Sequence, residues 1–311
     1  MILIINMKKE YSMGMFFMDT YINVKIYTED KIKADNALNE VKNLYKRYHD
    51  MTDIYNEDSE LSIINNNQSF ENELPIDPDL YNMLALGIKW HDKTNGAFNI
   101  NMSSVTKLWK KYRDNKNGVP TLQELKESGS IDINDIKLLP SNKIVNSKPN
   151  IDLGAISKGY ATEKAGELLQ SLGIDYFLIN AGGNVLAGKN TKRGYYKIGI
   201  ESPINELELY STVKGENIAV VTSGGYKRYY DYDGIRYHHI INPDTLMPTS
   251  HILSVTIISD SSTLADILST ALFVLPLEDG IKLIDSIDNA EAIFFIDKDN
   301  IIKSKGYSKY E

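Results

Sequence analysis

Strand-like and helix-like hydrophobic patterns follow one another along this chain in an irregular order. Residues 21–28 alternate polar with aliphatic side chains, which is the period of a half-buried strand. Residues 31–51 then place apolar side chains on one face of an amphipathic helix. A second helix is predicted over 77–94, with Asp77 as its N-cap and Pro78 at its first helical position. Because no regular alternation of strand and helix follows, the pattern favours an α+β fold.

The rest of the chain predicts shorter elements. Thr121 and Glu124 have the spacing of a helix capping box, within a polar segment over 113–150 that we interpret as an elaborated part of the surface. Residues 152–172 are expected to form a loop that runs into a helix. The further predictions are a helix from Ser261 or Ser262 to Val274, a helix over 278–287, and strands over 176–180, 195–200, 218–222, 236–241, 253–259 and 290–297.

Composition limits the classes of function that fit the chain. The 311 residues are 42% hydrophobic and 24% charged, which is typical of a folded protein with a sizeable core. The net charge is -8 and no basic stripe is visible, which argues against nucleic-acid binding. The absence of cysteine excludes disulfides, zinc–thiolate sites, a catalytic cysteine and lipid attachment at an N-terminal cysteine.

The apolar run at residues 1–5 is too short for the core of a signal peptide or for a membrane span. No membrane span is expected elsewhere in the sequence. We therefore expect a cytoplasmic location for the chain as it stands, with the extracytoplasmic face of a membrane as the alternative if a leader has been removed.

Residues 152–161, Asp-Leu-Gly-Ala-Ile-Ser-Lys-Gly-Tyr-Ala, have the features of an anion-binding helix start. Two glycines allow the backbone to approach a ligand closely, and the helix that follows points free N–H groups at that ligand. Lys158 adds a full positive charge. The segment suits a phosphate, although it matches neither a P-loop nor the dinucleotide-binding glycine motif. From the residues alone, an ordinary capped helix with a solvated lysine is an equally good interpretation.

Asp266 and Thr270 are four residues apart in a predicted helix and therefore share one of its faces. Carboxylate and hydroxyl oxygens suit Mg²⁺ and are poor ligands for zinc or copper. Two such ligands would leave positions for main-chain carbonyls, water and a substrate phosphate. Taken alone, the pair is more often an exposed aspartate and an unrelated threonine.

His238 and His239 follow a Thr-Ser-Gly-Gly-Tyr segment at 222–226. Adjacent residues of a strand point to opposite faces, so at most one of the two histidines can face a given site. A neutral histidine can act as a general base. For either residue by itself, a hydrogen-bonded structural histidine is the better interpretation.

Taken together and in this order, these segments resemble the ApbE family, the FAD:protein FMN transferases. The resemblance extends over about residues 17–275 and is most specific in DLGAISKGYA, NAGG and the ADxxxT pattern. The matching segments are 17–20, 55–65, 96–99, 152–161, 180–183, 222–224, 239–243 with Pro248, and 265–273.

The resemblance implies a single α+β domain of two interlocked halves with FAD bound between them. This domain would span 17–311, with 1–16 as a poorly ordered N-terminal extension. The implied activity is magnesium-dependent transfer of the FMN half of FAD to a threonine or serine hydroxyl of an acceptor flavoprotein, with AMP as leaving group. Two alternatives stay open: magnesium-dependent hydrolysis of FAD to FMN and AMP, and FAD binding without turnover.

The resemblance also assigns roles to individual residues. The main-chain oxygen of Ala155, the Asp266 carboxylate and the Thr270 hydroxyl would hold magnesium. His239 would help to activate the acceptor hydroxyl, with Lys158 and Asp266 acting on the phosphates. The expected FAD-binding residues are Met18, Tyr55 (against the adenine), Ala97, Phe98, Asn99, Asp152, Lys158 and Ile240.

Four positions depart from the family's pattern. Relatives commonly have an acidic residue at Asn242, glycine at Leu246, and aspartate at Gly225 and Asn184. Where an acidic residue is replaced, negative charge is lost near the expected site. This loss would change the number of bound metal ions more than the reaction itself.

Overall fold

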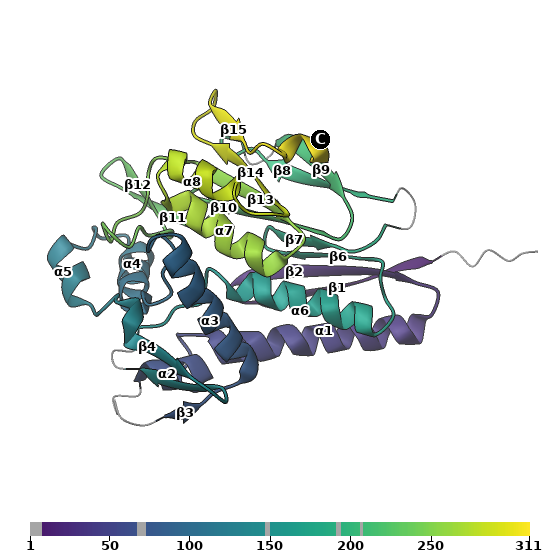
Figure 1. Ribbon diagram of the computed structural model, residues 1–311, viewed down its shortest axis with the longest axis horizontal. Helices are drawn as coiled ribbons and strands as arrows, with labels where there is room; N and C mark the ends of the chain where they lie inside the picture. Colours follow the sequence, from purple (N-terminus) through teal and green to yellow (C-terminus); the bar gives the residue numbers. More distant parts are fainter. Residues whose placement is uncertain (1–7, 67–72, 147–149, 191–193, 206–207) are drawn as a thin grey trace, which may run out of the picture.

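An eight-stranded sheet runs through the structure, in the order β1-β2-β6-β7-β10-β13-β14-β15 (Figure 1). The computed structural model describes residues 8–66, 73–146, 150–190, 194–205 and 208–311. Every pair of neighbouring strands in this sheet is antiparallel. The strands are β1 (Lys9–Phe17), β2 (Thr20–Thr28), β6 (Phe177–Ala181), β7 (Asn184–Ala187), β10 (Ile218–Gly224), β13 (Ser254–Ser259), β14 (Ala290–Phe295) and β15 (Ile301–Lys303).

Helices cover one face of the sheet and form the main core with it. They are α1 (Lys31–Thr52), α6 (Ser157–Ser171), α7 (Ser262–Val274) and α8 (Leu277–Ile284). The α1 helix buries the apolar stripe predicted from its spacing. The Tyr45 hydroxyl, buried within that stripe, is 2.9 Å from the Thr162 hydroxyl of α6, and this hydrogen bond ties the two helices together.

The opposite face of the sheet carries the hairpin of β8 (Tyr196–Glu201) and β9 (Leu209–Gly215). Ile198 and Val213 of this hairpin pack on Val220 and Ile258 of the sheet, which makes a second, smaller core. A C-terminal 3₁₀ turn, η2 (Tyr307–Tyr310), closes the edge of this core. The sheet is therefore the middle of three layers.

A long excursion separates β2 from β6 and gathers at the lower left of Figure 1. Besides α1 and α6, it contains α2 (Glu60–Asn66), β3 (Leu74–Pro75), α3 (Pro78–Lys93), α4 (Ser103–Asn115), α5 (Leu122–Glu127), η1 (Ile133–Asp135), β4 (Ile136–Leu139) and β5 (Lys143–Asn146). A second excursion forms the hairpin of β11 (Tyr229–Tyr232) and β12 (Ile235–His238). Trp109 of α4 stacks on Tyr237, and Tyr237 stacks on Tyr230, so a third apolar cluster joins the two excursions.

The local signals at helix starts are confirmed. Asp77 caps α3 by accepting from the Asp79 N–H, with Pro78 in the first turn. Thr121 and Glu124 form the predicted capping box of α5. The antiparallel sheet and its separate helices agree with the predicted α+β class.

Two boundaries need correction. Strand β1 pairs with β2 along its whole length, so residues 9–16 belong to the central sheet and not to an extension; residues 1–7 lie outside the described part of the chain. Strand β12 ends at His238, so the strand predicted over 236–241 is too long. The prediction missed the short alternation of β1, which forms an edge of the sheet.

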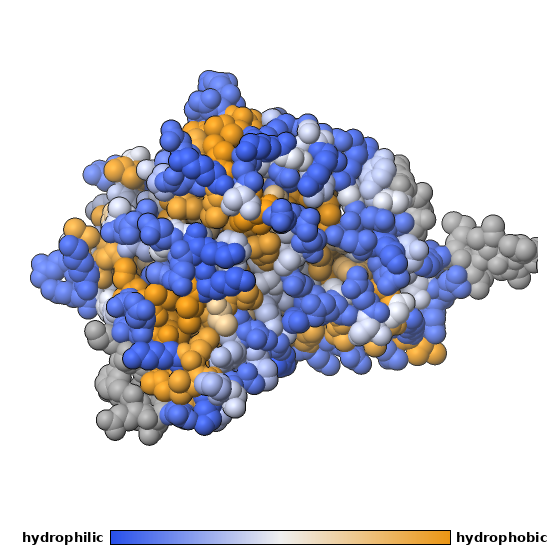
Figure 2. Space-filling model, in the orientation of Figure 1, coloured by the Kyte–Doolittle hydropathy of each residue, from blue (hydrophilic) through white to orange (hydrophobic). Residues whose placement is uncertain are grey.

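On the face shown in Figure 2, hydrophilic side chains predominate and hydrophobic ones reach the surface in separate patches. Within the residues that the structure describes, no helix has both the length and the apolar character needed to cross a membrane.

Candidate functional site

A cavity of about 720 Å³ opens where the sheet meets the two excursions. Its walls come from the turn between β1 and β2, helix α4, the start of α6, the end of β10, the residues after β12, and α7. This volume is typical of a small-molecule site. The cavity brings together most of the predicted site residues, namely Met18, Tyr55, Asn99, Asp152, Ala155, Lys158, His239, Ile240, Asp266 and Thr270.

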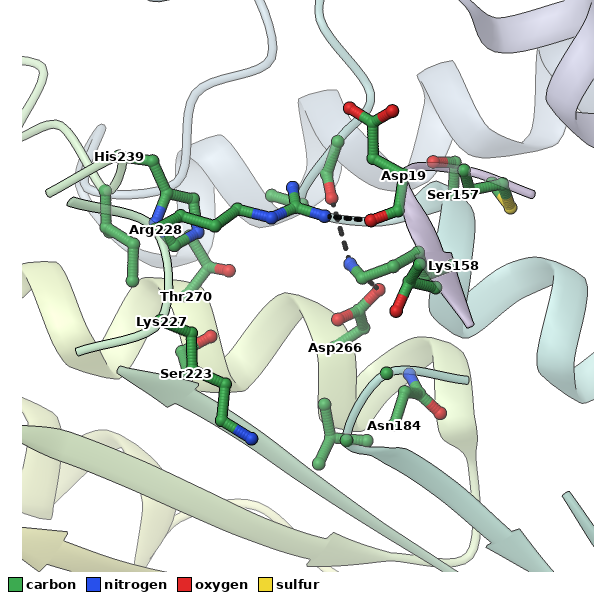
Figure 3. Close-up of a pocket in the computed structure, with 18 of the residues that line it drawn as sticks. Asp19, Ser157, Lys158, Asn184, Ser223, Lys227, Arg228, His239, Asp266 and Thr270 are labelled. Carbon is green, nitrogen blue, oxygen red and sulfur yellow. Dashed lines mark hydrogen bonds and ion pairs between the residues drawn. The ribbon is translucent and has the colours of Figure 1, made fainter. Parts of the chain in front are cut away.

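Asp266 lies where α6 and α7 touch, and it is 4% exposed. Its Oδ2 accepts the Gly159 N–H at 2.7 Å and lies 3.6 Å from the Lys158 ammonium (Figure 3). Burial raises the pKa of this carboxyl, while Lys158 and the Gly159 N–H oppose that rise by stabilising the charged form. A Cβ at Gly159 would lie only 2.5 Å from the Asp266 Cβ, so this approach of the helices requires glycine.

The bond between Gly159 and Asp266 leaves the main-chain oxygen of Ala155 free. In a regular helix the N–H of residue 159 would donate to the carbonyl of residue 155. Here that N–H is used by Asp266, and no other backbone N–H of the described residues donates to Ala155. The turn just before α6 therefore leaves a carbonyl oxygen without a backbone donor at the point where Asp266 approaches the helix.

These oxygens fit a magnesium ion. Thr270 follows Asp266 by one turn of α7, lines the same cavity, and its hydroxyl bonds to none of the described residues. A carboxylate, a hydroxyl and a main-chain carbonyl are hard oxygen ligands. The described residues contain no group of three or more His, Cys, Asp or Glu side chains that could hold a metal. The protein donors are thus few, as in magnesium sites completed by phosphate and water.

The start of α6 also favours an anion. Helix α6 has no side-chain N-cap; the Ser157, Gly159 and Tyr160 N–H groups of its first turn have acceptors among the described residues, and the Lys158 N–H has none. The Lys158 ammonium bends back to within 3.2 Å of the Gly154 carbonyl and lies in the cavity. The free N–H at the start of the helix and the Lys158 ammonium thus lie in the same region, and binding of an anion there stays a prediction.

Asp152 holds the loop that precedes α6. Its Oδ1 accepts the Gly154 N–H at 2.8 Å and its Oδ2 accepts the Thr106 hydroxyl of α4 at 2.7 Å. Since carboxylate oxygens accept more than one hydrogen bond each, this structural role leaves room for a ligand contact.

The Tyr55 ring lines the cavity and is 53% exposed. The Lys107 and Lys110 ammonium groups lie 5.9 and 5.5 Å from its centroid. An exposed ring with neighbouring cations is suited to stacking on an electron-rich base.

The remaining predicted flavin residues divide into two groups. Met18 lines the cavity in a left-handed conformation with φ 53°, within a tight turn, and Asn99 and Ile240 line it as well. Phe98 is 1% exposed and lies in the main core, against which Ala97 packs; neither lines the cavity. The turn predicted to touch FAD therefore presents only its last residue, Asn99.

His238 and His239 have different environments. His238 is buried, and its two ring nitrogens contact the Thr249 carbonyl at 2.6 Å and the Ile240 N–H at 3.2 Å. His239 lines the cavity, and its Nδ1 is buried without a partner among the described residues. Burial, with Arg228 and other nearby positive charges, lowers the pKa of His239 to about 3. The ring is therefore neutral at physiological pH. The selection of His239 agrees with this geometry, although the residue follows a strand instead of lying in one.

The loop after β12 shows how leucine is accommodated at position 246, where the family's pattern has glycine. Leu246 has a φ of 59°, the left-handed region in which glycine is favoured. Its side chain is buried in the third cluster, and its carbonyl accepts the Trp109 indole N–H at 2.8 Å. Packing and this hydrogen bond hold a backbone conformation that leucine rarely adopts. The Asn242 side chain caps the same loop by accepting the Asp244 N–H at 2.8 Å.

Sequence reasoning missed several cavity residues, above all Arg113 on α4 and Arg228 between β10 and β11. Neither belongs to a short motif. With Lys110, Lys158 and Lys227 they make five basic side chains in the lining, beside five acidic ones, Asp19, Asp53, Asp152, Glu201 and Asp266. The cavity therefore offers several cations to a polyanionic ligand, although its lining has no net positive charge.

Comparisons with known proteins identify the family of the chain. The sequence profile of the ApbE family matches residues 18–294. The chain is 30% identical to the FAD:protein FMN transferase of Treponema pallidum (strain Nichols), over 96% of this chain and 88% of that one. It is 29% identical to the FAD:protein FMN transferase of Vibrio cholerae serotype O1, over 86% and 82%. The crystal structure of the ApbE protein from Thermotoga maritima superposes with a TM-score of 0.88 at 26% identity, over 97% of this chain and 99% of that one.

Proposed function

This chain belongs to the ApbE family and is an FAD:protein FMN transferase, and from that premise we propose that it moves FMN from FAD onto a threonine or serine hydroxyl of an acceptor flavoprotein and releases AMP. The observation that carries the proposal is the meeting of α6 and α7. There a helix N-terminus, Lys158, a free Ala155 carbonyl and the buried Asp266 face one point of the cavity. This arrangement suits a pyrophosphate with a magnesium ion.

FAD would lie along the cavity with its adenine on the Tyr55 ring. Met18, Asn99, Asp152 and Ile240 would line the nucleotide. The pyrophosphate would lie at the α6 N-terminus, where Lys158 stabilises its charge. Stacking on Tyr55 would be the same in the ground and transition states, and so would contribute to affinity and not to rate.

Ala155, Asp266 and Thr270 would hold Mg²⁺. The ion would supply charge neutralisation at the phosphoryl oxygens as the transition state forms. The chain's own contribution is to hold Asp266 in place through the Gly159 N–H and to keep this region poor in water.

In the transfer step, the acceptor hydroxyl oxygen forms a bond to the phosphorus of the FMN half. The bond from this phosphorus to the oxygen bridging to AMP breaks, and AMP leaves with that electron pair. The hydroxyl proton passes to the neutral ring of His239. Positive charges around the ring make it a weak base in the free protein; the negative charges of a bound pyrophosphate would offset them.

Hydrolysis of FAD is the second candidate, because water would use the same residues in place of the acceptor hydroxyl. Binding of FAD without turnover is the third, and the presence of both His239 and the Asp266–Thr270 pair argues against it.

Two incubations separate these functions. Purified protein is mixed with FAD and MgCl₂, with and without a candidate flavoprotein subunit, and AMP is measured by chromatography while the subunit is weighed by mass spectrometry. We expect AMP release that depends on the subunit, together with a gain of one FMN per subunit. AMP release that does not need the subunit would indicate hydrolysis, and no AMP in either mixture would contradict both reactions.

Asp266→Ala serves as the inactive variant, and Asp260→Ala, an exposed carboxylate just before α7, as its matched control. Loss of a metal ligand removes several kcal/mol of transition-state stabilisation, on the order of 10³-fold or more in rate. Full activity in a folded Asp266→Ala protein would remove this residue from the mechanism.

A further inference from the structure

Arg228 reaches across the cavity from one wall to the other. It follows β10, and its backbone carbonyl accepts the His239 N–H at 3.2 Å. Its guanidinium donates to the main-chain carbonyl of Asp19, in the turn between β1 and β2, at 2.8 Å. Figure 3 shows the side chain extended from the His239 side of the cavity toward Asp19, with Lys158 and Asp266 on the Asp19 side. The guanidinium therefore lies among the groups assigned to the pyrophosphate and to the acceptor proton.

Arg228 differs from its neighbours in its lack of a carboxylate partner. Lys227 pairs with Glu201 at 2.6 Å, and Arg236 of the adjoining hairpin pairs with Asp231 at 3.1 Å. Among the residues that the structure describes, no carboxylate lies within ion-pair distance of Arg228. Within the described part of the chain its guanidinium makes one hydrogen bond, to a neutral carbonyl, which occupies one of five N–H donors. The side chain keeps its full charge and most of its donors for a ligand.

The charges around His239 place this arginine close to the reacting groups. Of the cations that act on the His239 ring, Arg228 has the largest effect, ahead of Arg113 and Lys158. Arg228, Arg113 and Lys158 come from three different parts of the chain and act on the same ring. Lys158 lies 3.6 Å from the Asp266 carboxylate and Arg113 lies 4.0 Å from that of Asp114, so within the described residues Arg228 is the one of the three without a carboxylate at ion-pair distance. A phosphate bound in the cavity would supply that partner.

We propose that Arg228 is a further catalytic residue, whose guanidinium binds the phosphoryl oxygens of the FMN half of FAD during transfer, on the side facing His239. Its remaining N–H donors match two oxygens of one phosphoryl group in a forked arrangement. Charge on these oxygens grows as the acceptor oxygen approaches and the bond to AMP breaks, so the interaction strengthens in the transition state. Lys158 acts from the opposite side, at the start of α6. The proposal rests on the proposed FMN transfer.

The test compares Arg228→Ala and Arg228→Lys with Arg236→Ala, a matched arginine that is paired with Asp231 outside the cavity lining. FAD affinity is measured by flavin fluorescence without acceptor, and the transfer rate constant by a single turnover with saturating FAD. We expect Arg228→Ala to transfer about 10²–10³-fold more slowly, with FAD affinity changed by less than about tenfold. Arg228→Lys should be intermediate, because an ammonium keeps the charge and loses the fork. Arg236→Ala should match the wild type.

Chemical rescue distinguishes a guanidinium that acts in catalysis from one that only holds the β1–β2 turn in place. Millimolar ethylguanidinium should restore part of the Arg228→Ala rate and leave the wild type and Arg236→Ala unchanged. A lowered melting temperature without rescue would overturn the proposal in favour of a role in tying the β1–β2 turn to the site. A weakened FAD affinity at an unchanged rate constant would overturn it in favour of flavin-ring recognition.

The wild-type protein tests the proposed function independently of the Arg228 variants. If the wild type transfers FMN and Arg228→Ala transfers equally fast, only the assignment of Arg228 fails. If the wild type releases AMP without transfer, the same comparison is made on AMP release. A wild type that does neither would overturn both proposals.

Discussion

Replacing Gly159 with alanine should damage both stability and transfer, because the two helices that form the magnesium site touch at this residue. The new Cβ would lie 2.5 Å from the Asp266 Cβ and 2.6 Å from the Ser262 carbonyl, whereas ordinary contact begins at 3.4 Å. The second contact is with backbone, so a side-chain rotation cannot relieve it. Helices α6 and α7 must therefore separate by about 1 Å.

The magnitude follows from two terms. Overpacking of a buried contact costs about 1–3 kcal/mol. Separation of the helices also lengthens the 2.7 Å bond from the Gly159 N–H to Asp266, and a hydrogen bond to a charged group contributes about 1.5–3 kcal/mol. We expect the free energy of unfolding to fall by about 3 kcal/mol or more. With a urea m-value of about 3 kcal/mol/M, the midpoint would fall by about 1 M. A displacement of this size at the site should slow transfer about 10²-fold.

The assay pairs urea unfolding with single-turnover transfer, and Gly280→Ala is the matched control. Gly280 lies within α8, where a Cβ would meet nothing closer than 3.6 Å. Alanine there should stabilise the protein by about 0.5–1 kcal/mol, since glycine is unfavourable inside a helix. A Gly159→Ala protein with the urea midpoint and transfer rate of the wild type would refute the argument that close packing at this residue sets the site.

Three further predictions concern other parts of the site and fold. Tyr55→Ala should weaken FAD affinity by about 1–3 kcal/mol with little change in turnover at saturation, and an unchanged FAD titration would contradict stacking on this ring. His239→Asn should slow transfer about 10²–10⁴-fold and His238→Asn much less, and equal damage from both substitutions would exclude the general-base role. Because the pKa of His239 is about 3, the pH profile of kcat/KM should lack an ascending limb from this residue between pH ~5 and ~8. Asp79→Asn should lower the free energy of unfolding at pH 7 by about 1–3 kcal/mol. Burial raises the pKa of the Asp79 carboxyl, but hydrogen bonds, led by that from Arg47, lower it below its usual value. The charged carboxylate therefore stabilises the fold above the pKa of the unfolded state, and this stabilisation is lost as pH falls through the pKa of the folded state. Urea unfolding at pH 7 and near pH 3 should therefore show a difference from the wild type that shrinks in acid, and a constant difference would argue against the charged form.

Local sequence signals predicted those elements whose cause is local. The capped starts of α3 and α5 depend on Asp77, Pro78, Thr121 and Glu124, and all four act within one turn of helix. Helix α4 went unpredicted because it begins at Ser103 without a side-chain cap and continues with many lysines. Trp109 on this helix is buried by packing against Tyr230 of β11 and Tyr237 of β12, and these strands are distant in sequence.

The site shows the same division. Asp266, Thr270 and Lys158 lie in contiguous motifs, so their chemistry was visible in the sequence. The free Ala155 carbonyl was implied only by resemblance; its physical cause is the diversion of the Gly159 N–H to a carboxylate 107 positions away. Arg228 was missed, because its contact with Asp19 joins residues 209 positions apart and neither side of that contact forms a recognisable pattern.

The order of strands in the sheet has a consequence for how the protein is made. Strand β6 pairs with β2, placing Ala181 opposite Ile22, although helices α1 to α6 lie between them in the chain. Such distant pairing slows folding, and synthesis proceeds from the N-terminus. The turn that carries Met18 is therefore made long before α7, and the cavity gains its Asp266 oxygen only when α7 docks on α6. During synthesis, therefore, the chain lacks the Asp266 side of the proposed pyrophosphate site until α7 has been made, and the last two strands of the sheet, β14 and β15, are made later still.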